Sequence, residues 1–253
     1  MTTNHKVRVL ALASVAMMVS GLAAADIPKA APIDPQTMAA IKAVLEQHPE
    51  LVANAMQATQ RADQDKRTAA LNATVSPIIQ EIAAAKNVPF AGKASGHLVV
   101  EFFDYNCGYC KQFAKSSELP LLASDKNVHF VYIFTPILSD GSKRLAEIAA
   151  AAYLQGKFKP AHDFLIAQEA QHATSDAADT LIPGMIKAAG LDETKLRLAL
   201  SDGSAAAVVK KHLDWAHRGQ VSGTPMIWAG GKAQPGAIPL APLVAMIEAA
   251  PAS

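Results

Sequence analysis

Apolar and aromatic residues gather in two continuous runs near the middle of the chain, at residues 97–103 and 128–134. Runs of this length and composition are typical of strands that are buried on both faces of a sheet. Residues 107–123 between them have a helical pattern, which indicates a strand–helix–strand unit with parallel strands. The small, glycine-containing stretch 91–96 before the first run predicts a turn.

The second half of the chain is helical in pattern over about residues 142–217, and its glycines and prolines divide it into four or five short helices. Strand character returns at residues 226–228. A turn at 229–232 leads to a short strand that ends near residue 235, and an amphipathic helix follows over 239–249. The alternation of strands and helices predicts a domain of the α/β class.

Ahead of the first strand, the sequence predicts two helices that are separated at His48-Pro49, because a residue before proline avoids the helical region. Asp34-Pro35 is a suitable start for the first helix. An apolar stripe runs along both helices and fades after Ala58: Met38, Ile41, Val44, Leu45, Leu51, Val52, Ala55 and Met56. Such a short stripe cannot form a core of its own. It either packs on the main domain or pairs with another copy, in a dimer or trimer through residues 34–70.

The first 25 residues differ from the rest of the chain. Lys6 and Arg8 precede an uncharged stretch that closes on three alanines, Ala23 to Ala25. This is the layout of a secretory signal peptide, so we expect export to the periplasm and cleavage near Ala25. A membrane anchor is the alternative, since about 17 apolar residues is the lower limit for spanning a bilayer.

Composition alone excludes some classes of function. The chain has 253 residues, 51% of them hydrophobic, and a formal net charge of +1. That apolar share suffices for a buried core. The balance of charge gives no reason to expect nucleic acid or an anionic membrane as a partner. Export would place the two cysteines of the chain, Cys107 and Cys110, in an oxidising compartment.

The Cys-Gly-Tyr-Cys motif at residues 107–110 has three interpretations. A structural disulfide is a poor one, because a disulfide stabilises mainly by closing a long loop and this ring spans only four residues. A four-cysteine metal site lacks its second pair, although His97 or Met226 could complete a weaker site for a soft metal. The third interpretation is a redox pair, which the position of the motif between a strand and a helix favours.

Cys107 stands at the predicted N-terminus of that helix, where free backbone N–H groups and the helix dipole stabilise a thiolate. The thiolate is the attacking species in disulfide exchange. Cys110 lies one turn later and deeper, so that it can attack the mixed disulfide and release the substrate. Gly108 and Tyr109 add no imidazole and no positive charge. We therefore expect a weaker oxidant than the most oxidising enzymes of this kind.

Four segments together resemble the DsbA family of periplasmic thioredoxin-fold proteins, in the group with an N-terminal helical segment that includes ScsC-like proteins. The segments are VEFFDYNCGYCK at 100–111, FTPIL at 134–138, GTP at 223–225 and PGA at 235–237. The resemblance covers about residues 95–250 and implies a thioredoxin-like fold with an inserted helical domain at about 142–217. We accordingly divide the chain into a signal peptide (1–25), a linker and N-terminal helical segment (26–90), and a thioredoxin-like catalytic domain (91–253).

The resemblance also implies roles for single residues. Thr224-Pro225 would form a cis peptide facing the cysteines and leave neighbouring backbone groups free to pair with an extended substrate; an ordinary trans proline is the alternative. Glu101 corresponds to a buried acidic residue of the family that relays a proton to or from Cys110; a glutamate that reaches solvent is the alternative. Gly108 and Tyr109 would contact the substrate.

Two functions remain open at this point. One is an enzyme that exchanges disulfides with cysteine-containing exported proteins, as an oxidase or an isomerase, needing no cofactor and reset by a membrane redox partner. The other is a periplasmic chaperone or copper-binding protein that uses the same cysteine pair. Three further expectations concern other residues. His162, His212 and His217 lie at the surface or have internal partners, Asp104 and Tyr105 shape the rim of the site, and Tyr132 and Trp228 belong to the core.

Overall fold

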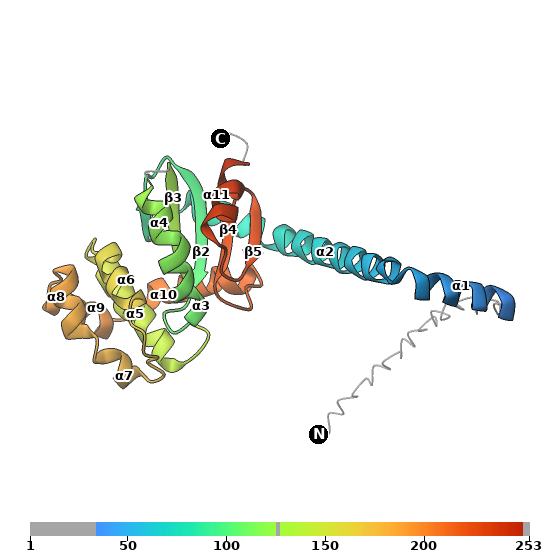
Figure 1. Cartoon of the computed structure of the whole chain (residues 1–253). Helices are drawn as coiled ribbons and strands as arrows, with labels where there is room; N and C mark the ends of the chain where they lie inside the picture. The colour runs from blue at the N-terminus through green and yellow to red at the C-terminus, as the bar shows by residue number, and fades with distance from the viewer. Residues whose placement is uncertain (1–33, 125–126, 250–253) are drawn as a thin grey trace, which may run out of the picture. The chain divides into compact units, whose positions relative to one another are not determined.

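The computed structural model describes residues 34–124 and 127–249 (Figure 1). The predicted signal peptide, residues 1–25, and most of the linker that follows it lie outside the described residues. The chain divides into two compact units, and the boundary falls after Met56, inside helix α2 (Pro49–Ala84). Within the described ranges, no helix is long and apolar enough to cross a membrane.

Helix α1 (Pro35–Gln47) and the start of α2 make up the described part of the first unit. The side chain of Asp34 accepts hydrogen bonds from the N–H groups of Gln36 and Thr37, at 3.0 and 2.9 Å, which confirms the predicted helix start. The predicted break at His48 is confirmed as well. The large residues of the apolar stripe are between 41% and 58% exposed: Met38, Ile41, Val44, Leu45, Leu51, Val52 and Met56.

A five-stranded mixed sheet lies at the centre of the second unit, in the order β1-β3-β2-β4-β5 (Figure 1). The strands are β1 (Phe90–Gly92), β2 (His97–Phe103), β3 (Val128–Phe134), β4 (Met226–Ala229) and β5 (Lys232–Pro235). Strands β2 and β3 are parallel, and the other pairs are antiparallel. The two apolar runs therefore form the predicted parallel pair.

Strand β1 occupies part of the stretch for which the sequence predicted only a turn. Its three residues pair with the outer edge of β3, in the register Phe90 to Val131, and are too few to show a period of two. Gly92 ends the strand with a φ of 82°, and a Cβ at this position would lie 2.2 Å from the carbonyl oxygen of Val128. Only glycine fits this close approach.

Helices follow β2 directly and make up the insertion between β3 and β4. After β2 come α3 (Gly108–Phe113), a π-helical segment η1 (Ala114–Glu118) and α4 (Leu119–Ala123). The insertion holds α5 (Asp140–Leu154), α6 (Phe158–Ile166), α7 (Ser175–Asp179), α8 (Ile182–Ala189), α9 (Glu193–Ser201) and α10 (Ser204–Arg218). It therefore has six helices where four or five were predicted. The chain's last described helix is α11 (Leu240–Glu248).

The strands send alternate side chains into two separate hydrophobic clusters, as the period of two requires. Val99 and Phe103 join the larger cluster, together with α3, α4, α11 and the insertion. Val100 and Phe102 point to the opposite face and join a second cluster. Both faces of the central strands are thus covered, which explains why their sequences are continuously apolar.

The last turns of α2 cover that second face. Val75, Ile78, Ile79 and Ile82 are at most 4% exposed and pack in the second cluster. The side chain of Asn72 accepts a hydrogen bond from the N–H of β5 residue Ala233 at 2.7 Å. Residues 71–84, which the sequence assigned to the N-terminal segment, therefore pack as part of the second unit.

Candidate functional site

The cysteine pair lies where the central strand β2 gives way to helix α3. Cys107 is the N-cap of α3, and the N–H of Cys110 donates a hydrogen bond to its sulfur at 3.4 Å. The structure describes both cysteines as free thiols. Cys107 is 6% exposed, whereas Cys110 is fully buried one turn deeper. This is the arrangement that the strand-to-helix pattern predicted.

A buried loop fixes the position of Cys107. One oxygen of Asp104 accepts from the N–H of Asn106 at 2.8 Å, and the other accepts from the N–H groups of Ile137 and Leu138 at 3.0 and 3.1 Å. Asp104 and Tyr105 are only 1% and 2% exposed, so the expectation that they shape the rim of the site is wrong. The carboxylate is needed inside, because it satisfies three backbone N–H groups that would otherwise have no partner there.

The loop at Thr224-Pro225 faces Cys107. The peptide bond between these residues is cis. The Cys107 thiol donates a hydrogen bond to the carbonyl oxygen of Thr224 at 3.2 Å, so this loop and the nucleophile are in direct contact. Beside the loop is a cavity of about 200 Å³, whose lining includes Gly223, Pro225 and Leu71 of α2.

The two thiols differ strongly in acidity. The pKa of Cys107 falls from its usual 9.0 to about 6, chiefly through a hydrogen bond with the Cys110 thiol, with help from the side chain of Thr224 and from backbone N–H groups, against the effect of burial. Burial, the hydrogen bond to Cys107 and the charge of Glu101 raise the pKa of Cys110 far above its usual value. Near neutral pH the pair therefore holds one thiolate, at Cys107, and one thiol.

Glu101 lies on β2 beneath the cysteines and is 2% exposed. Its neighbours in the sheet are Tyr132 on β3 and Ile227 on β4. Burial raises the pKa of Glu101 well above its usual value, and the charges of Glu118 and Cys107 add to this effect. The carboxyl group does not reach solvent, and it acts electrostatically on Cys110.

Gly108 and Tyr109 are both exposed at the surface between the cysteines. Tyr109 is 67% exposed, and a Cβ on Gly108 would meet nothing within 4 Å. Neither residue carries a charge, and both are accessible to a partner that approaches the motif.

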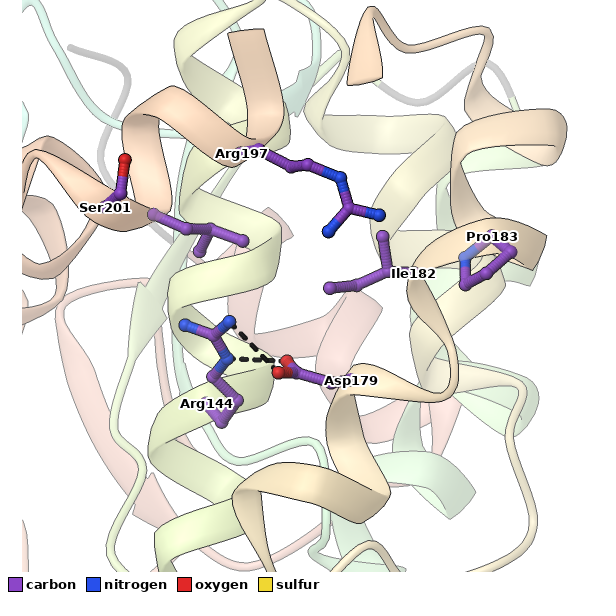
Figure 2. A pocket seen from close by; sticks show the side chains of 7 residues that line it. Arg144, Asp179, Ile182, Pro183, Arg197 and Ser201 are labelled. Carbon is purple, nitrogen blue, oxygen red and sulfur yellow. Dashed lines mark hydrogen bonds and ion pairs between the residues drawn. The ribbon is translucent and has the colours of Figure 1, made fainter. Parts of the chain in front are cut away.

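A second hollow, of about 320 Å³, lies in the helical insertion away from these residues (Figure 2). Arg144 and Arg197 point into it. Each already has a carboxylate partner, since Arg144 makes two hydrogen bonds to Asp179 and Arg197 pairs with Glu193. None of the site residues predicted from the sequence lines this hollow.

Four buried polar side chains form a cluster that the sequence did not predict. Tyr132 donates a hydrogen bond to Glu118 at 2.6 Å, and the hydroxyl of Tyr105 contacts His162 Nδ1 at 3.1 Å. All four residues are at most 2% exposed. The sequence placed Tyr132 in the core, which is confirmed, but it did not single out Glu118. The π-helical segment that ends at Glu118 cannot be recognised from the pattern of apolar and polar residues.

The other two histidines match the expectation. His217 is exposed. His212 is buried, accepts a hydrogen bond from the N–H of Phe134 at 3.1 Å and stacks on its ring. Burial, with the nearby charge of Lys211, lowers the pKa of His212 to about 3. It is a neutral core histidine.

A mixed five-stranded sheet with a Cys-x-x-Cys pair at the N-terminus of the helix after its central strand defines a thioredoxin-like protein. The family model described as "Thioredoxin" matches residues 87–249, and the chain belongs to this family. No curated protein matches the sequence.

Several solved structures are similar to this chain. A thioredoxin-like oxidoreductase from Silicibacter pomeroyi DSS-3 is 29% identical, with a TM-score of 0.59 over 66% of this chain and 93% of that one. The thiol-disulfide exchange protein alpha-DsbA2 from Wolbachia pipientis is 21% identical, with a TM-score of 0.63 over 72% and 97%. ScsC from Proteus mirabilis, in a transitional conformation, is 17% identical, with a TM-score of 0.58 over 85% and 97%.

The last two likenesses show the fold alone, because their identities are low. Together with the family match, these neighbours confirm the thioredoxin-like fold. The family match and the neighbour that is 29% identical support a thioredoxin-like oxidoreductase as the general class.

Proposed function

We propose that this protein exchanges disulfides with exported proteins through Cys107 and Cys110. The observation that carries the proposal is the difference between the two thiols. Cys107 has a pKa of about 6 and contacts the Thr224 loop, whereas Cys110 is buried and keeps its proton. A low-pKa thiolate beside a protonated second thiol is the arrangement that attack followed by resolution requires.

The exchange proceeds in two displacements. The Cys107 thiolate attacks one sulfur of a substrate disulfide, and the other substrate sulfur leaves as a thiolate. Cys110 then loses its proton and attacks the Cys107 sulfur, which releases the substrate's second thiolate and leaves a Cys107–Cys110 disulfide. In the reverse direction a substrate dithiol is oxidised, and its two electrons reduce the pair.

Other residues serve these steps. Glu101, buried beside the pair, takes the proton of Cys110 during the second displacement and returns it in the reverse direction. The backbone at Thr224-Pro225 pairs with an extended substrate segment, in the manner of an added strand. Tyr109, being exposed next to the nucleophile, contacts the same segment.

The cellular setting is part of the proposal. The N-terminal sequence favours export to the periplasm, where substrates are proteins with cysteines and a membrane redox partner resets the pair. The pKa of about 6 at Cys107 lies well above the value of about 3.5 in the strongest oxidant of this kind. This supports a moderate reduction potential, suited to isomerisation as well as oxidation.

The test is to trap the intermediate. Cys110→Ala should accumulate mixed disulfides with exported proteins, while Cys107→Ala should accumulate none. If Cys107→Ala trapped partners and Cys110→Ala did not, the assignment of the two roles would be wrong. The copper-binding alternative is addressed by titrating the same two variants and the native chain with cuprous ion. Tight stoichiometric copper binding without any exchange with glutathione would replace the proposal.

We further propose that the exposed stripe of α1 and α2 joins two or three copies. Seven large apolar side chains of these helices are between 41% and 58% exposed, and burying them between copies would be favourable. A shared cleft would hold a misfolded substrate near several cysteine pairs while its disulfides are reshuffled.

Deletion of residues 26–70 tests the oligomer. The deletion stops before Leu71 because Asn72 and the residues after it hold the second unit together. We expect light scattering to report a monomer, with loss of isomerisation of a scrambled substrate and retention of dithiol oxidation. Leu45→Glu and Met56→Glu in the full chain should give the same result. A chain from residue 26 that is already monomeric at micromolar concentration would contradict the proposal.

A further inference from the structure

Two buried polar atoms face each other between η1 and the helical insertion. They are Oε2 of Glu118 and Nε2 of His162, 3.7 Å apart, on side chains that are both 1% exposed. Neither atom has a hydrogen-bond partner among the described residues. Buried polar atoms without partners are uncommon in folded proteins, so this pair calls for a physical reason.

The other polar atom of each side chain is held in place. Tyr132 donates its hydroxyl to Glu118 Oε1 at 2.6 Å, and the Tyr105 hydroxyl contacts His162 Nδ1 at 3.1 Å. Tyrosine hydroxyls keep their protons at neutral pH, because their ordinary pKa is about 10. When Nδ1–H donates to Tyr105, the lone pair of Nε2 points at Glu118. Such outer contacts are how metal-binding histidines and carboxylates are oriented.

The distance of 3.7 Å between Glu118 Oε2 and His162 Nε2 indicates what can lie between the two atoms. A direct hydrogen bond between nitrogen and oxygen needs about 2.7–3.2 Å. A water molecule bonded to both atoms at about 2.8 Å, with a tetrahedral angle, would hold them about 4.6 Å apart. Two ligands of one zinc ion, at about 2.0–2.1 Å each, lie about 3.4 Å apart and somewhat farther when the angle opens.

A third oxygen ligand is next to the pair. Asp163 follows His162 in α6, and one ligand atom each from Glu118, His162 and Asp163 lie within 4.8 Å of one another. The Asp163 side chain is 44% exposed, so the cluster reaches solvent on this side.

We propose that Glu118, His162 and Asp163 form a binding site for a divalent zinc ion, separate from the cysteine pair. One imidazole nitrogen and two carboxylate oxygens, with a fourth position open to water, are a donor set that zinc accepts. The ion links η1, which continues the helix of the cysteines, to α6 of the insertion. It stabilises the packing of η1 against α6, and it takes no part in the thiol chemistry.

Lys159 is the charged group that opposes the ion. Its ammonium group pairs with Asp163 and lies 3.8 Å from Glu118 Oε1. Without metal, this cation offsets part of the negative charge of the two carboxylates. Zinc must compete with it, so removing the lysine charge should tighten zinc binding, whereas it would weaken a cluster held together only by ion pairs.

The test uses the untagged chain from residue 26 with Cys107 and Cys110 oxidised to their disulfide, so that no thiolate can bind metal. Equilibrium dialysis against zinc should give one ion per chain. Asp163→Asn, at an exposed position that folding tolerates, should raise the dissociation constant at least tenfold, and Lys159→Gln should lower it at least threefold. His217→Gln, an exposed histidine on α10, is the matched control and should leave it unchanged.

Cobalt provides a second readout that does not depend on affinity. Bound to the oxidised chain, it should show visible absorption bands that Asp163→Asn weakens and excess zinc removes. The proposal is overturned if the oxidised chain retains no zinc, if Asp163→Asn and His217→Gln bind it equally, or if Lys159→Gln binds it more weakly than the native chain.

Discussion

Replacing Cys110 with alanine removes the largest single contribution to the low pKa of Cys107, the hydrogen bond with the Cys110 thiol. The hydrogen bonds from the Thr224 side chain and from the N–H groups of residues 109 and 110 remain. We therefore expect the pKa to rise only part of the way from about 6 toward 9.0. A rise of about one unit would correspond to about 1.4 kcal/mol of lost thiolate stabilisation.

The rate of alkylation of the reduced protein measures this pKa, because only the thiolate reacts with iodoacetamide. With a pKa of about 6, the thiolate fraction of Cys107 is about 10% at pH 5 and about 90% at pH 7. Mass spectrometry should show one fast site in the native protein and a curve shifted to higher pH in Cys110→Ala. A native midpoint above pH 8, or an unchanged curve in the variant, would refute the reasoning.

The same pKa predicts how stability depends on pH. A thiol whose pKa is lower in the folded state stabilises that state above the unfolded pKa, and this contribution is lost as the pH falls through the folded pKa. With values of about 6 and 9.0, the reduced protein should lose about 1 kcal/mol of unfolding free energy between pH 7 and pH 5. Urea denaturation measures it, and the oxidised protein, which has no thiolate, is the control.

Four substitutions test other parts of the structure. Glu101→Gln should lengthen the lifetime of the mixed disulfide about 100-fold in single-turnover experiments, because the resolving thiol loses its proton acceptor; an unchanged lifetime would exclude the relay. Tyr132→Phe leaves Glu118 Oε1 without its hydrogen bond and should cost about 1–3 kcal/mol in urea denaturation. Ile82→Ala, at a fully buried position of α2, should cost about 2–5 kcal/mol. Leu198→Ala, at a 59% exposed position, should change stability by less than about 0.5 kcal/mol.

Much of the fold could be predicted from the sequence, because the composition of its two central strands is typical of strands in the middle of a sheet. Residues 99–103 and 130–134 are buried on both faces, so their side chains are almost all apolar or aromatic. The position of Cys107 followed from the junction of strand and helix. Strand β1 was missed because its pairing depends on the free edge of β3 and not on a pattern of its own.

Residues 71–84 at the end of α2 were assigned to the N-terminal segment, although they pack in the second unit. The reason is different here. Val75, Ile78, Ile79 and Ile82 have helical spacing that the sequence shows, but the polar stretch before them suggested that the apolar stripe had ended. The site around Glu118 could not be predicted at all. Its members come from η1, α6 and β3, and only the folded chain brings them together.

The electrostatics of the site also explain why the two displacements occur in order. The negative charge of the Cys107 thiolate and its hydrogen bond to Cys110 are among the causes that raise the pKa of Cys110, and that charge raises the pKa of Glu101 as well. Attack on a substrate turns the Cys107 thiolate into a neutral disulfide, which removes these contributions. The proton of Cys110 is then held only by burial and by the charge of Glu101. The second thiol therefore becomes easier to deprotonate once the mixed disulfide has formed, and it stays protonated before then.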